Sequence, residues 1–339
     1  MNGLALLRGI LRISGGLGYT PVAPTWLYRK SHVINPASGA GTDYQVKIIV
    51  HYGSGVDYND NTKSPPEGHV YVGGKCRTDF GDIRFTAADG ETPLFYWMEE
   101  KVDGDYAVFW VRVEDDLSVN PVTIYVYYGN PSATTISDGK ATFVLFDDFN
   151  DGVLDSMWTE YDFWGSGVTV TEENGYVEIV SNGTYSAGEI RVLLPSSMSN
   201  LAVDVKFMEP VRDNIEGFNV VLQDPSRYLY WDYYDKYDRY RIIDGTTQIA
   251  YKSAQMPTTT FWKSYFLLSG TRVQLIIPDG SIDISGTISA SKNVESVALN
   301  ISAKNVANMT ARFDDFRVRK YVYPEPSHGA WGPEETAPF

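Results

Sequence analysis

The sequence has 339 residues, which is long enough for two domains that each bury a core. Aromatic residues make up 14% of it and include 24 tyrosines. Because aromatic side chains suit the pleated surface of a sheet, this composition favours β structure. The formal net charge of −15 excludes nucleic acid as a partner, since phosphate binding needs a basic surface. The single cysteine, Cys76, excludes an intrachain disulfide and a thiolate metal cluster.

Residues 1–25 are predicted to form an N-terminal arm. Its apolar stretch, residues 4–13, is interrupted by two arginines and is too short to span a membrane. It also lacks the pattern of a secretory signal peptide. Leu4, Leu7 and Leu11 fall on one face of a helix, and we expect them to dock the arm on a second copy of the chain. An added strand and a locally packed terminus remain alternatives.

A first β-domain is predicted over residues 26–143. Apolar and polar residues alternate along residues 45–50 and 108–113, as in strands with one buried face. Residues 53–76 are rich in Gly, Pro, Asn and Asp, which is typical of a long loop.

A second β-domain is predicted over residues 144–323. About eleven short strands are expected there, separated by turn signals such as Asn174-Gly175 and Asp279-Gly280. This spacing favours a jelly-roll sandwich. The proline-rich segment 324–339 is expected to be an extended, partly disordered tail. The predicted fold class is therefore all-β, with two β-sandwich domains and an N-terminal arm.

Several segments of the first domain resemble a known family. They are WLYRK (26–30), DIRFT (82–86), LFYWME (94–99), FWVRV (109–113) and IYVYYGNP (124–131). In this order and spacing they are similar to the motifs of the family catalogued as domain of unknown function 2341. That domain is commonly followed by a concanavalin-like, laminin-G-like sandwich with the motifs FDDF and LDxxxW. FDDF occurs here at 146–149, and the similar segment LDSMW at 154–158 has one residue fewer between Asp and Trp. The resemblance implies two β-sandwiches in large surface or extracellular proteins, many archaeal and some viral.

The tetrapeptide FDDF occurs again at residues 313–316, near the end of the second domain. If the first and last strands of this sandwich meet, the acidic pairs converge, and carboxylates share a site at low cost only around a cation. Strand alternation directs one aspartate of each pair toward such a site. We therefore predict a structural calcium ion bound by Asp148 and Asp315 with backbone carbonyls. The alternative is that these aspartates cap turns or pair with Arg317 and Arg319.

A cluster of aromatic residues lies between positions 228 and 240. In a strand, Tyr228 and Tyr230 share one face, while Leu229 and Trp231 share the other. Half of the cluster is therefore expected in the core. Aromatic rings stack on sugar rings, so the outward residues are predicted to contact a glycan or a protein. The predicted ligand-binding residues are Tyr228, Tyr230, Tyr234 and Tyr237.

Catalytic motifs are absent from the sequence. It contains neither Glu-x-Asp-x-x-Glu, which places the two carboxylates of laminarinase-type hydrolases on one strand, nor a Gly-x-Ser-x-Gly elbow. The four histidines form no His-x-x-x-His pair, which argues against a zinc site. We therefore predict a non-catalytic structural protein of a surface or virion, located outside the cell, that self-assembles and recognises glycans. A carbohydrate-active enzyme or carbohydrate-binding module is the alternative.

Overall fold

The computed structural model describes residues 26–337 except positions 214, 226 and 257. The chain divides into two compact units, of which the first contains residues up to Thr142 and Val322–Phe339 and the second contains Phe143–Tyr321. Within the described ranges the helical elements are α1 (Gly139–Thr142) and the 3-10 turn η1 (Asp235–Tyr237). None of the described helices has the length and apolar character needed to cross a membrane. The predicted all-β class is confirmed.

Unit 1 contains two sheets, with strand orders β24-β1-β8-β5 and β3-β4-β2-β7-β6. The strands of the first sheet are β1 (Tyr28–Asn35), β5 (Arg84–Thr86), β8 (Val122–Tyr128), β24 (Ser327–Trp331) and β25 (Glu335–Thr336), the last also pairing with β1. Those of the second are β2 (Tyr44–His51), β3 (Tyr58–Asp60), β4 (Glu67–Tyr71), β6 (Tyr96–Val102) and β7 (Tyr106–Val113). Ile48, Phe109 and Ile124 belong to the shared core. Residues 53–76 were predicted to form a loop, but they contain the two short strands β3 and β4.

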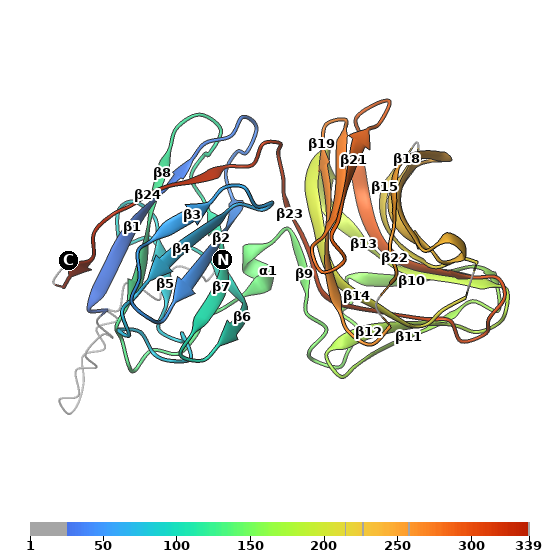
Figure 1. Ribbon diagram of the computed structural model, residues 1–339, viewed down its shortest axis with the longest axis horizontal. Helices are drawn as coiled ribbons and strands as arrows, with labels where there is room; N and C mark the ends of the chain where they lie inside the picture. The colour runs from blue at the N-terminus through green and yellow to red at the C-terminus, as the bar shows by residue number, and fades with distance from the viewer. Residues whose placement is uncertain (1–25, 214, 226, 257, 338–339) are drawn as a thin grey trace, which may run out of the picture. The chain divides into compact units, whose positions relative to one another are not determined.

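The C-terminal segment is a strand of unit 1, so the prediction of an extended, partly disordered tail is wrong. β24 runs antiparallel to β1, with Ser327 opposite Asn35, and the two lie side by side in Figure 1. The prolines of this segment flank β24 and do not interrupt it. Ser327–Trp331 therefore keeps the backbone N–H groups that a sheet ladder needs.

Unit 2 is a sandwich of a seven-stranded and an eight-stranded sheet. The first has the order β10-β13-β22-β15-β16-β17-β18, and the second has the order β11-β12-β23-β14-β19-β20-β21 with β9 also pairing with β23. The strands of the seven-stranded sheet are β10 (Trp158–Gly165), β13 (Ser186–Met198), β15 (Phe218–Asp224), β16 (Arg227–Tyr234), β17 (Arg239–Asp244), β18 (Thr247–Ser253) and β22 (Val294–Ala303).

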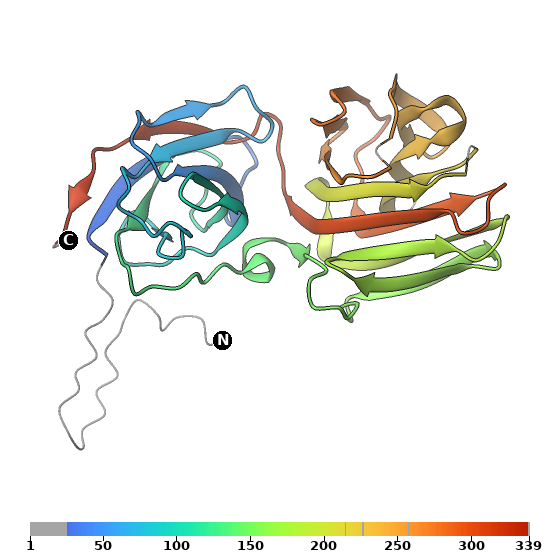
Figure 2. The ribbon, with the colours of Figure 1, turned by 60° about the horizontal axis from the view of Figure 1, so that its bottom comes forward.

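The strands of the eight-stranded sheet are β9 (Leu145–Asp147), β11 (Val168–Glu173), β12 (Tyr176–Ser181), β14 (Asn200–Val211), β19 (Trp262–Ser269), β20 (Arg272–Ile277), β21 (Ile282–Thr287) and β23 (Thr310–Lys320). Figure 2 shows the red strand β23 between the green strand β12 and the yellow strand β14, as the sheet order requires.

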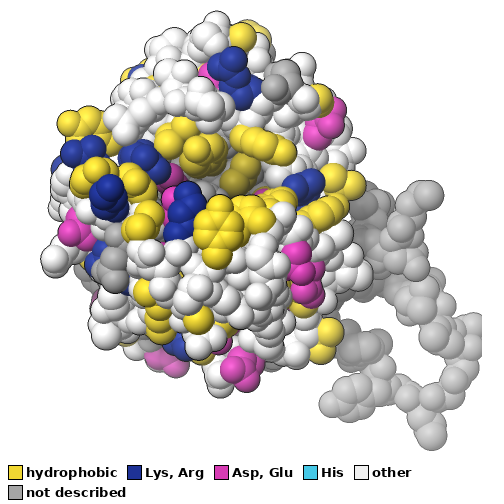
Figure 3. All heavy atoms as spheres, turned by 90° about the vertical axis from the view of Figure 1, so that its right-hand side faces the viewer, with side chains coloured by type: hydrophobic (Ala, Val, Ile, Leu, Met, Phe, Trp, Pro, Cys, Tyr) yellow, Lys and Arg dark blue, Asp and Glu magenta, His cyan; other side chains and the backbone are white. Residues whose placement is uncertain are grey.

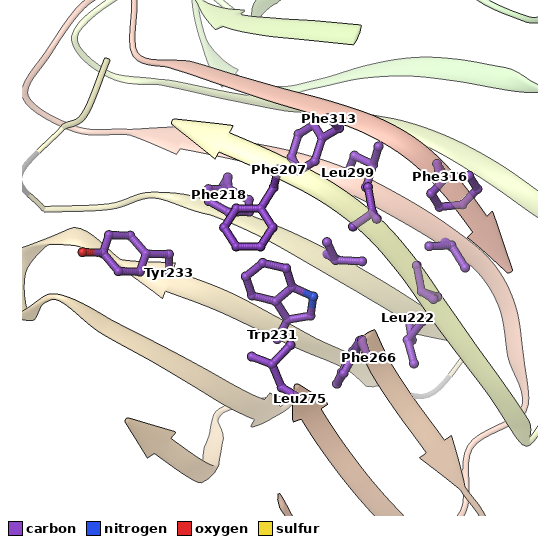
Figure 4. Packing of buried hydrophobic residues seen from close by; sticks show 14 of the residues in the cluster. Phe207, Phe218, Leu222, Trp231, Tyr233, Phe266, Leu275, Leu299, Phe313 and Phe316 are labelled. Atoms are coloured by element: carbon purple, nitrogen blue, oxygen red, sulfur yellow. The ribbon is translucent and has the colours of Figure 1, made fainter. Parts of the chain in front are cut away.

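Large aromatic side chains fill the space between the two sheets of unit 2. Phe207 of β14 packs against Phe218 of β15 and Trp231 of β16, with ring centroids 5.3 and 5.2 Å apart. All three are fully buried, and Figure 4 shows them turned toward one another from the two sheets. Burying rings of this size contributes much of the favourable free energy of folding. This core also determines which face of β16 is left for solvent.

Candidate functional site

The candidate site is the face of the seven-stranded sheet that points away from this core. Along β16, Leu229, Trp231 and Tyr233 are buried in the core, while the alternating residues point outward. We call this outward side of the seven-stranded sheet the β16 face, because β16 carries most of its predicted residues. Figure 3 views the molecule from this side and shows hydrophobic side chains, a class that includes tyrosine, together with lysine and arginine side chains around a hollow.

The structure places the four predicted ligand-binding tyrosines in one region of this face. Tyr228, Tyr230 and Tyr234 lie on the outward side of β16, with Asp232 between the last two, and Tyr237 follows in η1. Tyr228 and Tyr237 are 56% and 49% exposed, whereas Tyr230 and Tyr234 are half-buried. The rings of Tyr234 and Tyr237 meet edge to face, with centroids 5.4 Å apart. From Tyr228 to Tyr234 the row is about 20 Å long. It presents apolar ring surface to solvent.

Polar residues form a second row, which crosses the strands of the same face. Strand register aligns them side by side in the order Glu189, Asn300, Asn219, Asp232 and Arg241, and we call this set the polar row. At its two ends the register places Tyr161 opposite Glu189 and Tyr251 opposite Arg241. The polar row therefore offers carboxylate, amide and guanidinium groups between tyrosines.

The carboxylates of the polar row are buried and paired with arginines. Arg191 Nε donates to Glu189 Oε1 at 2.6 Å, and Arg241 Nε donates to Asp232 Oδ1 at 2.9 Å. Burial raises the pKa of both Glu189 and Asp232, and the arginines oppose this shift. The same arginines stack on rings, Arg191 over Tyr161 at 4.2 Å and Arg241 over Tyr234 at 4.1 Å. The polar groups of this face are therefore fixed in position before any ligand arrives.

The polar row was not predicted from the sequence. Glu189 and Arg191 alternate on β13, a signal for a shared face, but the alignment of Glu189 with Asp232 depends on the register of four strands. A single sequence does not specify that register.

The two acidic ends of unit 2 meet in the structure. β9 pairs antiparallel with β23, and Asp147 lies opposite Phe316. Asp147 Oδ2 accepts a hydrogen bond from Trp158 Nε1 at 2.8 Å, and Asp315 forms an ion pair with Lys206. Burial and the neighbouring Asp315 raise the pKa of Asp314 to about 6. Arg317 and Arg319 each form an ion pair with Asp204.

Over the described residues, no group of three or more histidine, cysteine, aspartate or glutamate side chains is placed to hold a metal ion. The ammonium group of Lys206 supplies positive charge to Asp315. Calcium binding by Asp148 and Asp315 stays a prediction, as do self-assembly and a location on a surface or virion. The predicted assembly residues Leu4, Leu7 and Leu11 lie outside the described residues.

The four histidines, widely separated in sequence, form two pairs in unit 1. His32 Nε2 lies 2.8 Å from His328 Nδ1, and His51 Nε2 lies 3.0 Å from His69 Nδ1. Gly68 lies beside the first pair, where an added Cβ would be 2.6 Å from His328 Nδ1. Sequence reasoning missed these pairs because strand pairing between distant segments creates them.

A family model described as a domain of unknown function (DUF2341) matches residues 79–164. This match confirms the resemblance to that family. No curated protein matches the chain.

Several solved structures are similar to about half of this chain. The carbohydrate-binding module CBM66 from Bacillus subtilis is 14% identical with a TM-score of 0.38, covering 48% of this chain and 96% of its own. The β-glucanase of Bacillus licheniformis is 12% identical with a TM-score of 0.42, covering 52% and 97%. The catalytic domain of a laminarinase from Thermotoga petrophila RKU-1 is 10% identical with a TM-score of 0.43, covering 53% and 97%. The likeness is one of fold.

Proposed function

We propose that unit 2 binds carbohydrate on the β16 face and does not hydrolyse it. The observation that carries this proposal is the crossing of the two rows, apolar tyrosine rings along β16 and hydrogen-bonding groups across the strands. A sugar ring has C–H faces that pack on aromatic rings and hydroxyl groups that need polar partners. A surface with ring faces beside fixed polar groups satisfies both needs.

The spacing of the carboxylates supports binding without hydrolysis. Glu189 and Asp232 lie on β13 and β16, and β22 and β15 lie between them. Three inter-strand spacings of about 4.8 Å separate their backbones by about 14 Å. Retaining glycosidases need carboxyl groups about 5 Å apart, and inverting enzymes need them about 6.5–9.5 Å apart. These two side chains are also paired with arginines, so neither is available as a nucleophile.

A glycan array followed by titration calorimetry tests this proposal on the intact protein. We expect binding to selected oligosaccharides, and we expect Tyr228→Ala to weaken it about tenfold, as loss of an exposed aromatic contact does in other interfaces. Tyr58→Ala is the matched control, because Tyr58 is a comparably exposed tyrosine of unit 1. An array without any bound glycan would reject the proposal, and so would equal losses in the two variants.

The enzymatic alternative is tested on the same glycans. After prolonged incubation with each bound oligosaccharide, we expect no new reducing ends. Hydrolysis that disappears in Glu189→Gln would contradict the proposal and assign catalysis to the polar row. Hydrolysis that persists in this variant would also contradict the proposal and would assign catalysis to other carboxylates of the chain.

A further inference from the structure

Arg239 differs from the other arginines of the β16 face. Arg191 and Arg241 each pair with a carboxylate of the polar row. Arg239, on β17 opposite Tyr234, has neither a hydrogen bond nor an ion pair with the described residues, and its Nε is buried without a partner. Every other arginine in residues 26–337 has such a partner.

Two tyrosine rings hold this guanidinium in place. Its carbon lies 4.9 Å from the ring centroid of Tyr237 and 4.8 Å from that of Tyr251. Cation–π contacts of this kind orient the planar group without neutralising its charge. Tyr237 and Tyr251 are themselves about half exposed. The result is a positioned cation whose hydrogen-bond donors are not used by the surrounding residues.

An unpaired arginine is unexpected in this chain. The formal net charge is −15, so acidic side chains outnumber basic ones by 43 to 28. A buried donor without a partner costs stability, because its hydrogen bonds to water are lost on folding. The terminal nitrogens of Arg239 are not among these buried atoms, so they are the donors that an anionic ligand can reach. The excess negative charge elsewhere hinders such a ligand little, since salt screens charges beyond about 8 Å at physiological ionic strength.

We propose that Arg239 receives the anionic group of an acidic carbohydrate, either the carboxylate of a uronic acid or a sulfate ester. The inference rests on the proposed function and names the class of glycan that the β16 face prefers. Two parallel N–H donors of a guanidinium group match two oxygens of a carboxylate or of a sulfate ester. Arg239 and Arg241 alternate on β17, about 7 Å apart. When the anionic group of one sugar binds Arg239, the adjoining sugar of the same chain therefore lies beside Arg241 and the polar row.

The test compares acidic and neutral oligosaccharides on the full-length protein. The array carries oligogalacturonates, chondroitin sulfate oligosaccharides, their desulfated forms, and neutral gluco-, galacto- and xylo-oligosaccharides. We expect the strongest binding to acidic members. Arg239→Gln should weaken that binding about tenfold or more in calorimetry, with neutral binding changed less than about twofold. Arg239→Lys should recover part of the loss, because charge remains but the planar fork does not.

Lys252→Gln serves as the charge control. Lys252 is an exposed cation on the neighbouring strand β18, opposite the buried Tyr240, so it lies on the other side of the sheet and its loss changes the net charge by the same amount. Equal weakening in Lys252→Gln and Arg239→Gln would overturn the inference in favour of non-specific attraction. Unchanged thermal unfolding establishes that each variant is folded.

The remaining outcomes separate this inference from the proposed function. Binding of neutral glycans alone, unaffected by Arg239→Gln, would overturn the inference and leave the proposed function standing. Absence of any binding would reject both. If acidic glycans bind, loss of binding on desulfation would assign the sulfate as the recognised group, and retention would assign the carboxylate.

Discussion

At the scale of residues, the aromatic side chains of β16 alternate between the core and the β16 face. Trp231 and Tyr233 point inward and are fully buried, whereas Tyr228 and Tyr230 point to the β16 face. This division was predictable from the sequence, because side chains of a strand alternate between its faces. The roles of the outward residues depend on neighbours from other strands. Single substitutions therefore test the two faces separately.

Trp231→Ala should destabilise unit 2 by about 3–5 kcal/mol, because it removes a ring packed against Phe207 and Phe218 and leaves a cavity. Tyr228→Ala, on the other face of the same strand, should change the free energy of unfolding by less than about 0.5 kcal/mol. Urea denaturation measures both. Similar effects of the two substitutions would mean that the assignment of faces is wrong.

Asp204 is a buried carboxylate shared by two buried arginines. Its Oδ2 accepts hydrogen bonds from Arg317 Nε at 3.2 Å and Arg319 Nε at 3.0 Å. Asp204→Asn removes the negative charge that both guanidinium groups face, which should cost about 3–5 kcal/mol. The control is Asp103→Asn at the exposed pair with Lys101, worth less than about 1 kcal/mol. A small effect at Asp204 in the same denaturation experiment would contradict this reading.

At the scale of elements, β24 shows how a terminal segment completes a sheet. It pairs with β1, and just beyond it Tyr128 Oη donates to Glu334 Oε2 at 2.7 Å. A chain that stops at Pro324 would lose these contacts and expose an edge of the sheet. We expect its unit 1 to unfold at a lower temperature and unit 2 to keep its own transition. Calorimetry of the truncated chain checks this, and an unchanged first transition would argue against the pairing.

Elements with local signals were predicted correctly, while elements made by distant pairing were not. The alternating residues 45–50 and 108–113 form parts of β2 and β7. β24 was missed because prolines surround it and because its partner β1 lies almost a full chain length away. The polar row was missed for a related reason, since the register of neighbouring strands is a property of the folded sheet.

At the scale of the whole molecule, the two units should respond to acid in opposite directions. In unit 1, burial lowers the pKa of His32 well below its usual value, and that of His328 to about 4. The unfolded state then binds more protons below pH 6.5, so stability falls toward pH 4 by up to about 1.4 kcal/mol per pH unit for each histidine.

In unit 2, burial raises the pKa of Glu209, and that of Asp314 to about 6. There the native state binds more protons, so stability rises as the pH falls below about 6.

Calorimetry between about pH 7 and pH 5 should therefore show one transition moving to lower temperature and the other moving to higher temperature. Hydrogen exchange followed by mass spectrometry assigns each transition to its unit. His328→Gln should reduce the shift of the unit 1 transition. Parallel movement of both transitions would contradict the opposite pKa shifts.

Binding of carbohydrate on the β16 face is tested by a crystal structure of the full chain in complex with the oligosaccharide that binds best on the array. We predict that its sugar rings lie on Tyr228 and Tyr234 and that its hydroxyl groups reach the polar row. A bound oligosaccharide on unit 1, or on the eight-stranded sheet of unit 2, would contradict the account.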